Sequence, residues 1–538
     1  MTSVAHLAVK AGLAVMHGRR LSRLIHAANA PAKAQTEVLR RILSTNAQTT
    51  FGERHGFAAL RNPADYRQAV PVQTYEDLRS DIEAQEMTGE PRLTAEGPVY
   101  YNRTSGTVAA PKNIPVTQSG LKRIQAHQRL AAYAFSKGPP ILAGRMFAVT
   151  GAAVEGHMPG GTPYGSASGL LYQNQSRLLS ARYVLPAELA SIEDYEQRYL
   201  AMATCGLAAA DVTCAATPNS STLIRLLDLV NARADELLRR VTDGGTTAKP
   251  DADRARRLRG ILDRSGSLTF ADIWPRLAGL VTWTGGSCGV AARKLRPMLP
   301  ADCAVIELGY VASEVHGSVN VDPIHNVCLP TLTDTFFEFA ERDAWETDSA
   351  HADIVGLDEL EPDHDYYVIV TTSNGLYRYD MNDIVRVSGR MNQTPALDFV
   401  QKGKGVTSIT GEKLHETQVL DAVCATLEQM GVDNRFFIVL ADQDTSRYTL
   451  YLEAAGDMRS ADHIGEGVDA RLRATNIEYD GKRASDRLKP LDVRPLVPGS
   501  GDAYRQSRVA QGQRDAQFKY LHLQYAHECS FDFESKAR

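Results

Sequence analysis

The sequence predicts an α/β protein with a large N-terminal domain of mixed β-sheets and flanking helices, followed by a small α+β C-terminal domain. Short apolar segments bounded by glycine or polar residues alternate with amphipathic helical segments over 1–400. The segment 401–405 combines two glycines with two lysines, as suits a hinge, and separates 1–400 from 401–538. With 538 residues, 43% of them hydrophobic and 23% charged, the chain can bury a large core in more than one domain.

Helices are expected in the N-terminal part of the large domain. The apolar segment 4–16 has some features of an export signal, but His6 and Lys10 interrupt it, so we expect an amphipathic helix there. Over 35–78 the pattern is helical, with one apolar stripe and a further short helix at 75–78. No run approaches the roughly twenty apolar residues that a membrane span needs, so we expect a soluble protein.

Strands are expected where apolar runs are short. An apolar stripe at helical spacing over 223–241 predicts one long helix, and Ser373-Asn374 predicts a hairpin turn between two extended segments. The glycine-rich segment 160–169 predicts a loop that lines a pocket, and Gly431 is expected to end a helix. The expected strands are 141–150, 280–284, 305–308, 335–339, 366–372 and 375–387 in the large domain and 436–440, 448–452 and 493–497 in the small one, where helices are expected at 415–430 and 461–473.

The composition argues against several classes of function. A formal net charge of −5 and a pI of about 6.3 give no overall field that would attract nucleic acid or anionic lipid. The basic cluster at 253–259 has the spacing of a solvated helix face. The seven cysteines are scattered, with no Cys-x-x-Cys pair and no nearby histidine spacing. They predict reduced thiols in a cytoplasmic protein and no zinc site.

One segment has the composition of a loop that grips phosphate. Its glycine lets the backbone approach an anion, the hydroxyl groups beside it donate hydrogen bonds, and a lysine supplies a compact positive charge. A Ser/Thr/Gly run before a proline is also typical of an ordinary turn, so this segment alone leaves both interpretations open. The residues concerned are Thr104, Ser105, Gly106, Thr107 and Lys112.

A second candidate follows the expected strand 305–308. There Tyr310, Ser313 and Glu314 place an aromatic ring, a hydroxyl and a carboxylate together. Ligands of α/β sheets bind at the carboxyl ends of strands. At such a place the Tyr310 ring could stack on a base and Glu314 could hold Mg²⁺ beside a triphosphate. The alternative is an ordinary loop glutamate.

Two further candidates lie closer to the C-terminus. Asp383 ends the extended segment that begins at Gly375 and could accept both hydroxyls of a ribose, although Asn382-Asp383 is also typical of a plain turn. Lys519 lies between Phe518 and Tyr520, whose rings would partly desolvate its ammonium. Such a lysine can neutralise charge that develops on an α-phosphate, but most lysines near a chain terminus have no such role.

These candidates occur in the order phosphate loop, Tyr-x-x-Ser-Glu, Tyr-Arg-x-x-x-x-Asp, glycine hinge and terminal lysine. In this order the chain resembles the adenylate-forming superfamily of acyl-CoA synthetases and luciferases. It resembles more closely the auxin-responsive family of acyl acid amido synthetases, known mainly from plants, from about Gln35 to about Leu521. The closer resemblance rests on Val70-Pro71-Val72 with Tyr75-Glu76-Asp77, Asn113-Ile114-Pro115, Phe337-Glu338-Phe339 and Leu376-Tyr377-Arg378-Tyr379.

The resemblance implies an ATP- and Mg²⁺-dependent ligase with a large adenylation domain at 1–400 and a small mobile domain at 401–538. A carboxylate attacks the α-phosphate of ATP with release of pyrophosphate, and an amine, often an amino acid, then attacks the acyl-adenylate to give an amide. Coenzyme A is the main alternative acceptor. The implied partners are these small molecules, with no nucleic acid, membrane or obligate protein partner.

The resemblance also implies roles for individual residues. Lys519 and Lys112 would be catalytic, and rotation near Gly403 would bring Lys519 in for adenylation. The acyl pocket is expected between the helix that starts near Gly120 and the loop 161–169. There Arg123 could pair the substrate carboxylate, or it could be a surface arginine. The remaining expected positions are Gly286, Ser287, Tyr310, Ala312, Ser313, Glu314, Asp383 and Lys413 for the nucleotide, Ser166 and Ser168 for the acid, and Glu412, with Lys413, as an acidic-basic pair of open role.

The chain departs from the family pattern in three places. Val108-Ala109-Ala110 stands where the family often keeps a further glycine, so the phosphate loop should be stiffer. Gly317 comes about one residue early. Asp380 and Asn382 replace a basic residue and a glycine, and Asn382 can still adopt the left-handed conformation that glycine allows.

Two other classes of function stay open on the sequence alone. The segment 285–289 follows an expected strand and precedes a helical segment, as in the nucleophile elbow of a serine hydrolase, with Ser287 as nucleophile. Glu314 and His364 are available as triad partners, but neither has a recognisable setting. A catalytically silent relative that binds an acyl acid or a nucleotide is the third class.

Overall fold

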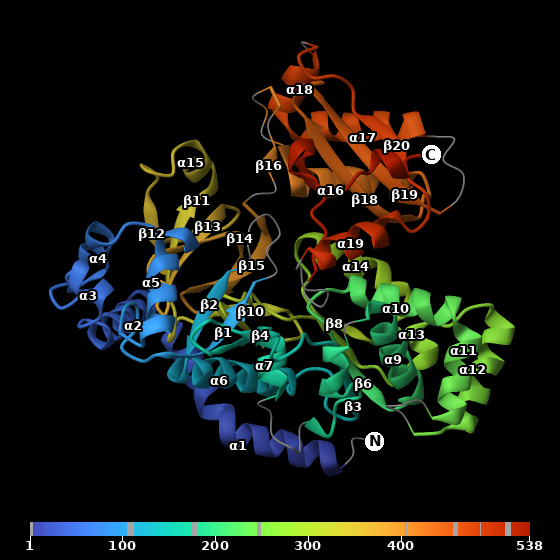
Figure 1. Ribbon diagram of the computed structural model, residues 1–538, viewed down its shortest axis with the longest axis horizontal. Helices are drawn as coiled ribbons and strands as arrows, with labels where there is room; N and C mark the ends of the chain where they lie inside the picture. The colour runs from blue at the N-terminus through green and yellow to red at the C-terminus, as the bar shows by residue number, and fades with distance from the viewer. Residues whose placement is uncertain are drawn as a thin grey trace. The chain divides into compact units, whose positions relative to one another are not determined.

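The computed structural model divides the chain into two compact units, shown in Figure 1. The larger unit comprises Met1–Thr104, Pro111–Met381 and Val385–Phe399, and the smaller one comprises Asn382–Ile384 and Val400–Arg538. The structure describes residues 4–104, 112–173, 180–192, 194–244, 249–403, 406–407, 409–410, 412, 414–455, 461–484, 486–511 and 518–538.

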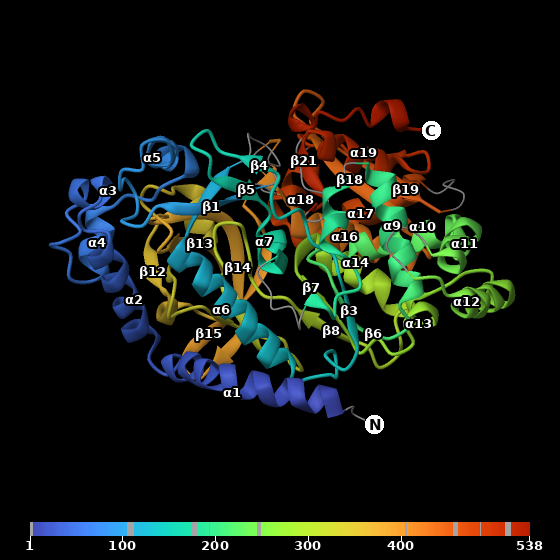
Figure 2. The ribbon, with the colours of Figure 1, turned by 60° about the horizontal axis from the view of Figure 1, so that its bottom comes forward.

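The N-terminal part of the larger unit is helical, as expected. The first helix is longer than the segment 4–16 suggests and runs beside α6 (Gln118–Phe135), as both views show (Figure 1, Figure 2). The apolar stripe of the second helix is buried, as predicted. Among the described residues, no helix combines the length and apolar character needed to cross a bilayer. The helices are α1 (Val4–Ala27), α2 (Pro31–Thr45), α3 (Thr50–Arg54), α4 (Pro63–Ala69) and α5 (Tyr75–Thr88).

A four-stranded sheet with the order β2-β1-β5-β4 carries the hairpin that leads into the predicted phosphate loop. Strands β1 (Pro98–Arg103) and β2 (Asn113–Thr117) are antiparallel, and β5 (Pro163–Gly165) pairs with β1 in parallel. The expectation of an unstructured loop over 160–169 was therefore wrong in part. Pairing with β1 extends the middle of this segment, and α7 (Ala167–Gln173) begins within it; β4 is Gly156–His157.

A second sheet, with the order β3-β6-β7-β8, is parallel throughout. Helices α9, α10 and α14 lie together beside it (Figure 2). The predicted long helix over 223–241 is broken at Arg233, where the backbone leaves the helical region, and forms α10 and α11. The elements are β3 (Arg145–Ala148), β6 (Val212–Ala216), β7 (Gly279–Thr282), β8 (Ala304–Glu307), α9 (Tyr195–Ala208), α10 (Ser221–Ala232), α11 (Ala234–Asp243), α12 (Ala252–Ser265), α13 (Phe270–Ile273) and α14 (Gly286–Leu295), with 3₁₀ turns at Ala187–Ser191 and Arg296–Met298.

A third sheet has five strands in the order β12-β11-β13-β14-β15. The turn between its third and fourth strands contains Ser373 and Asn374, as predicted, but β14 begins only at Tyr379 because Gly375 and Arg378 adopt positive φ angles. The strands are β11 (Phe336–Glu341), β12 (Ile354–Gly356), β13 (Asp365–Thr371), β14 (Tyr379–Met391) and β15 (Thr394–Lys402), with the separate pair β9 (Ser318–Asp322) and β10 (Val327–Pro330), helix α15 (Arg342–Thr347) and a 3₁₀ turn at Leu357–Glu359.

The smaller unit is built on a four-stranded sheet with the order β20-β19-β18-β21. Gly431 has a φ of 65° directly after the C-cap of α16 and ends that helix, as predicted. The short strand β21 and the helices α18 and α19 were not predicted from the sequence. The elements are β16 (Val406–Thr407), β17 (Leu414–His415), α16 (Glu416–Gln429), β18 (Asn434–Asp442), β19 (Arg447–Ala454), α17 (Ala461–Thr475), α18 (Ile477–Ala484), β20 (Asp492–Pro495), α19 (Ser500–Ala510) and β21 (Leu523–Tyr525), with 3₁₀ turns at Ala526–Glu528 and Glu534–Lys536.

A buried ion cluster joins α4 to the five-stranded sheet. The Glu338 carboxylate on β11 is fully buried and accepts hydrogen bonds from Arg67 Nε at 2.9 Å and Arg378 Nε at 3.1 Å. Arg378 also donates to the carbonyl oxygen of Val70 at 2.8 Å. Its own carbonyl accepts from the backbone N–H of Gln73 at 2.9 Å. The cluster therefore fixes the backbone that leads into β14.

We expect Glu338→Ala to lower the free energy of unfolding of the larger unit by about 3–5 kcal/mol, because it leaves buried guanidinium charge without its partner. The loss can be measured by urea unfolding followed by tryptophan fluorescence, since Trp274, Trp283 and Trp345 all lie in this unit. Glu37→Ala, at an exposed position on α2, is the control. A loss equal to that of the control would contradict this assignment.

Candidate functional site

The predicted phosphate loop is closed at its base by two hydrogen bonds. The Thr104 backbone N–H donates to the Lys112 carbonyl at 2.9 Å, and the Lys112 N–H donates to Thr104 Oγ1 at 3.0 Å. These bonds extend the β1–β2 ladder by one pair. Ser105, Gly106 and Thr107 lie outside the described residues.

The Lys112 side chain is directed by two tyrosines. Its ammonium donates to Tyr379 Oη at 3.0 Å and lies 5.5 Å and 5.9 Å from the ring centroids of Tyr379 and Tyr75. Tyr379 follows the anchored Arg378, and its neighbour Asp380 donates a backbone hydrogen bond to Gln73. The ion cluster around Glu338 thus fixes the side chain that holds the Lys112 charge at the base of the loop.

One hydrogen bond brings two of the predicted motifs together. Asn102, the residue before the last of β1, is buried and donates from Nδ2 to the carbonyl oxygen of Ser313 at 2.9 Å. The Ala312 N–H closes a tight turn by donating to the Val315 carbonyl at 2.8 Å. Glu314 is half-buried and forms no hydrogen bond or ion pair with another described residue. Its carboxylate is therefore available to a ligand next to the phosphate-loop hairpin.

Tyr310 has a structural role, because its ring packs in the core and its carbonyl accepts two backbone hydrogen bonds. The ring belongs to the main hydrophobic core and stacks on Phe399 at a centroid distance of 6.4 Å. The Tyr310 carbonyl accepts the backbone N–H groups of Gly317 and Ser318 at 2.8 and 3.0 Å. Tyr310 thus anchors the start of the loop, and only a small part of its ring, 6% of the residue surface, is exposed.

The turn between β7 and α14 is closely packed. A side chain at Gly285 would place its Cβ 2.2 Å from the Phe399 carbonyl oxygen, so only glycine fits there. Gly286 and Ser287 form the first turn of α14, but the Ser287 side chain lies outside the description. His364, suggested as a triad partner of Ser287, lies beside Glu361 and Tyr366.

Glu307, which the sequence analysis did not single out, organises the same turn. Its carboxylate accepts hydrogen bonds from the Thr284 N–H at 2.7 Å, Thr284 Oγ1 at 2.5 Å and the Gly309 N–H at 2.8 Å. Burial raises the pKa of Glu307, and the neighbouring Asp398 carboxylate adds to the rise. Glu307 is the last residue of β8, at the carboxyl end of a parallel sheet, and this position in the expected strand 305–308 could have marked it in the sequence as a candidate site residue.

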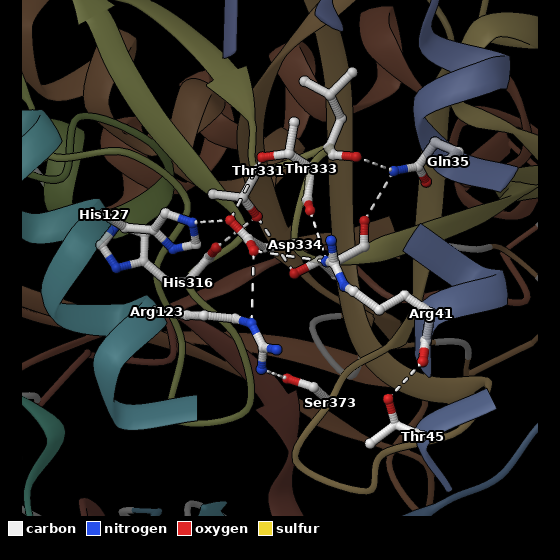
Figure 3. Close-up of polar contacts among 12 residues, drawn as sticks. Gln35, Arg41, Thr45, Arg123, His127, His316, Thr331, Thr333, Asp334 and Ser373 are labelled. Carbon is white, nitrogen blue, oxygen red and sulfur yellow. Dashed lines mark hydrogen bonds and ion pairs between the residues drawn. The ribbon is translucent and has the colours of Figure 1, made fainter. Parts of the chain in front are cut away.

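Arg123 belongs to a partly buried polar cluster, shown in Figure 3. Its Nη1 donates to Ser373 Oγ at 2.5 Å, and its Nε lies 3.7 Å from the Asp334 carboxylate. One turn further along α6, His127 Nε2 lies 2.8 Å from the same carboxylate, and Arg41 approaches it from α2 at 3.7 Å. Arg123 is thus half-buried and already paired, rather than a plain surface arginine.

The cluster keeps Asp334 charged, and burial keeps the His316 ring neutral. Burial raises the pKa of Asp334, but the hydrogen bond with His127 and the charges of Arg41 and Arg123 outweigh it and hold the pKa below its usual value. Burial lowers the pKa of His316 to about 3, so its ring is neutral at physiological pH. The rings of His127 and His316 lie 5.3 Å apart, and neither Nδ1 has a hydrogen-bond partner among the described atoms.

The two serines expected at the acid pocket serve the local fold. Ser166 is fully buried, and its Oγ accepts the Gly169 N–H at 2.9 Å within the first turn of α7. Ser168 Oγ accepts the Gly151 N–H at 3.2 Å and lies 3.3 Å from Ser166 Oγ. Both oxygens therefore hold backbone segments in place.

In the smaller unit, Asp383 is buried and paired with an unexpected partner. Its carboxylate forms an ion pair with Lys402, which the sequence analysis treated only as part of the hinge. Asn382 has a φ of 48°, which confirms the predicted left-handed conformation, and its carbonyl accepts the Gly403 N–H at 2.9 Å. The two contacts join Asn382 and Asp383 to the hinge residues; both lie within β14, so the expectation that the extended segment ends in a turn at Asp383 was wrong.

Glu412 has a structural role in the smaller unit. The carboxylate is fully buried and accepts hydrogen bonds from the Ile409 N–H, from both the N–H and Oγ1 of Thr410, and from Tyr448 Oη, all at 2.8–2.9 Å. Burial raises the pKa of Glu412, but these hydrogen bonds outweigh it and lower the pKa below its usual value. Its predicted companion Lys413 lies outside the described residues.

Lys519 has the setting that the sequence predicted. It is half-buried, and the rings on either side of it lie in the unit's core, Phe518 fully buried and Tyr520 packed against it. Those two rings meet edge to face at a centroid distance of 4.8 Å. The backbone around Lys519 is therefore fixed by apolar packing.

Comparison with protein family models shows which family the chain belongs to. Models of the GH3 family match almost all of the chain, with the N-terminal domain at 20–303, the central domain at 328–402 and the C-terminal domain at 417–527. The chain belongs to the GH3 family. The GH3 assignment confirms the predicted resemblance to the acyl acid amido synthetases and the predicted class of enzyme, an amide-forming ligase.

Curated and solved GH3 proteins are similar over nearly the whole length. A probable indole-3-acetic acid-amido synthetase, GH3.4 of Oryza sativa subsp. japonica, is 25% identical over 94% of this chain and 87% of its own. A jasmonoyl-L-amino acid synthetase, GH3.5 of the same organism, is 24% identical over 91% of each. The solved GH3.15 acyl acid amido synthetase has a TM-score of 0.83 at 23% identity, covering 97% of this chain and 96% of its own. This likeness confirms the predicted fold class.

The GH3 matches leave two of the candidate segments outside. Tyr310 and Glu314 fall between the N-terminal and central matches, near the shifted Gly317, and Glu412 falls between the central and C-terminal matches. Asp383 and Lys519 lie within matched domains.

We expect Glu412→Gln to destabilise the smaller unit by about 1–3 kcal/mol near neutral pH, because the amide replaces a carboxylate that accepts four hydrogen bonds. Since the folded pKa of Glu412 is lowered, its contribution is present above the unfolded value of about 4.3 and is lost as the pH falls. Urea unfolding followed by circular dichroism should show a large difference between the variant and the native protein at about pH 7.5, and this difference should shrink progressively as the pH falls below about 4.3. Glu466→Gln, exposed on α17, is the control, and a difference that does not depend on pH would contradict this account.

Proposed function

We propose that this protein activates a small carboxylic acid with ATP as an acyl-adenylate, releases pyrophosphate, and transfers the acyl group to the amine of an amino acid. The observation that carries the proposal is the Asn102–Ser313 hydrogen bond, which holds the Glu314 loop beside the hairpin that bears Lys112. The names of the GH3 relatives, which describe indole-3-acetic acid-amido and jasmonoyl-amino acid synthetases, support the same reaction.

In the first step two anions must meet, so the phosphates need positive charge and hydrogen-bond donors. Lys112 supplies charge at the base of the loop, and Thr104, Ser105, Gly106 and Thr107 supply donors and close backbone approach. The tyrosine contacts that hold Lys112 support this role, because its ammonium is positioned before any ligand arrives.

Glu314 fits the role of a magnesium ligand, because its carboxylate is half-exposed and unpaired among the described residues. Mg²⁺ bound there would screen the charge of the triphosphate. Asn102 and the turn closed by Ala312 hold the carboxylate in place. The backbone of Tyr310, Ala312 and Ser313, with Gly286 and Ser287 at the start of α14, would line the nucleotide.

Asp383 would accept the ribose hydroxyls, and nucleotide binding then requires exchange of its present partner, Lys402. Lys519 would neutralise charge on the α-phosphate during adenylation. Lys413 would contact the nucleotide in the same state. The adjacent hinge residues support the idea that the small domain changes orientation between the two steps.

The acid would bind near α6, with Arg123 as the partner of its carboxylate. Because Arg123 is already bonded to Ser373 and faces Asp334, the substrate carboxylate would replace Ser373 as a partner. Ser166 and Ser168 would shape this pocket through the backbone segments that they hold.

The proposed function can be tested by pyrophosphate release from ATP and Mg²⁺ with a panel of acids. The panel contains indole-3-acetic acid, jasmonic acid, simple aromatic and aliphatic acids, and 2,4-DB, the acid bound in a solved GH3.15 acyl acid amido synthetase. Each acid is tested with and without an amino acid mixture or coenzyme A. We expect acid-dependent release and an amide product. Thioester formation with coenzyme A alone would identify an acyl-CoA ligase. Labelling of Ser287 by a fluorophosphonate without any release would identify a hydrolase, and silence in both assays a binding protein.

The roles of Asp383 and Lys519 predict different kinetic effects. Asp383→Ala should raise the KM for ATP by about 10–100-fold, as expected for the loss of charged hydrogen bonds. Lys519→Ala should lower the rate of adenylation by about 100–1,000-fold and change ATP affinity by less than about 3-fold. Initial rates and ATP binding by calorimetry measure the two effects, with the exposed Lys489→Ala as control. Equal effects of both substitutions on KM and rate would refute the assignment.

A further inference from the structure

A buried carboxylate in the smaller unit has no part in the proposed reaction. Glu416 is the first residue of α16 and is 7% exposed. Its Oε1 accepts the backbone N–H of His522 at 2.5 Å. His522 comes three residues after Lys519, so Glu416 grips the segment that carries the candidate catalytic lysine.

The same segment is fixed on its other sides by the sheet. The His522 carbonyl accepts the Val439 N–H at 2.8 Å, and His522 Nδ1 lies 2.7 Å from the Phe437 carbonyl on β18. Phe518 and Tyr520 pack in the core, and Lys519, between them in sequence, is half-buried. A carboxylate bonded at His522 therefore helps to fix the backbone of the segment that carries the lysine.

Glu416 and Lys519 also interact through their charges. Burial raises the pKa of the Glu416 carboxyl to about 7, while the His522 N–H and the Lys519 ammonium oppose this rise. Two further titratable side chains belong to residues near Glu416: His522, whose backbone N–H it accepts, and Tyr504 on α19, whose pKa is raised to about 12 by burial, so the tyrosine stays neutral. Among the described residues, Lys519 is the charged side chain that acts on this carboxylate.

We propose that Glu416 is a positioning residue for Lys519: its carboxylate anchors the segment through the His522 N–H and, when ionised, pairs with the Lys519 ammonium and directs it. The inference rests on the proposed function, in which Lys519 acts during adenylation. Because the carboxylate gains a proton as the pH falls through about 7, adenylation should lose this directing charge in mildly acidic solution.

Glu416→Gln separates the two parts of the role. Its amide oxygen still accepts the His522 N–H, but the charge is absent at every pH. We expect ATP–pyrophosphate exchange with the acid that the panel identifies to fall about 10-fold at pH 8, and the acidic limb of its pH profile to flatten. Amide formation from the chemically prepared acyl-adenylate should change by less than about 2-fold. Glu428→Gln, exposed on the same helix, is the matched control.

Two results would overturn the proposal. An unchanged exchange rate and pH profile would show that Glu416 does not direct Lys519. An equal loss in both half-reactions would show a role in folding alone. Either result leaves the proposed function intact, provided that the native protein catalyses exchange.

The pairing of Glu416 with Lys519 can also be measured without any catalytic activity, through the chemical reactivity of the Lys519 amine. Labelling of Lys519 by an amine-reactive ester, followed by peptide mass spectrometry, reports how much free amine is present. At about pH 8 we expect labelling of Glu416→Gln to be several-fold faster than that of the native protein, because the neighbouring carboxylate favours the ammonium form. At about pH 6, where Glu416 is mostly protonated, the two proteins should react alike. Equal labelling at both values of pH would refute the pairing.

Discussion

The larger unit depends on the buried carboxylate of Glu338 and the two guanidinium groups that surround it. Arg67 comes from α4 and Arg378 from the turn before β14, so one cluster joins the N-terminal helices to the central sheet. A buried charge is tolerated only when its partners are held in place. Arg378 meets this condition with a left-handed backbone and hydrogen bonds to two carbonyl groups. From this anchor the chain places Tyr379, and Tyr379 places Lys112.

The same cluster gives a physical meaning to several of the family motifs. Val70, Glu338 and Arg378 belong to three separate stretches of similarity, and in the structure they bond to one another. Tyr75, from a further motif, accepts the Asn113 N–H at 3.0 Å and so steadies the loop hairpin. These motif residues fix the backbone segments that carry the candidate site. The groups available to a ligand, such as Glu314, lie in the loops that those segments support.

The sequence predicted what local patterns determine. Short apolar runs identified β3, β7 and β8 of the parallel sheet but not β6, and Gly431 and Asn382 adopt the positive φ angles that their positions suggested. The strand at 163–165 escaped prediction because its pairing with β1 depends on residues sixty positions away. The roles of Glu307 and Lys402 depend likewise on partners about twenty residues away in the chain, which no local spacing reveals. Arg123 was located correctly on α6, but its pairing with Asp334 and Ser373 required the folded chain.

In the proposed reaction Asp383 has two successive partners, Lys402 while no ligand is present and the ribose hydroxyls when the nucleotide binds. An unpaired anion in the protein interior would be costly, and Lys402 lowers that cost in the ligand-free protein. A ribose that binds as proposed gains only the excess of its hydrogen bonds over the ion pair. Substitution of the half-exposed Lys402 would then change how strongly the nucleotide is retained.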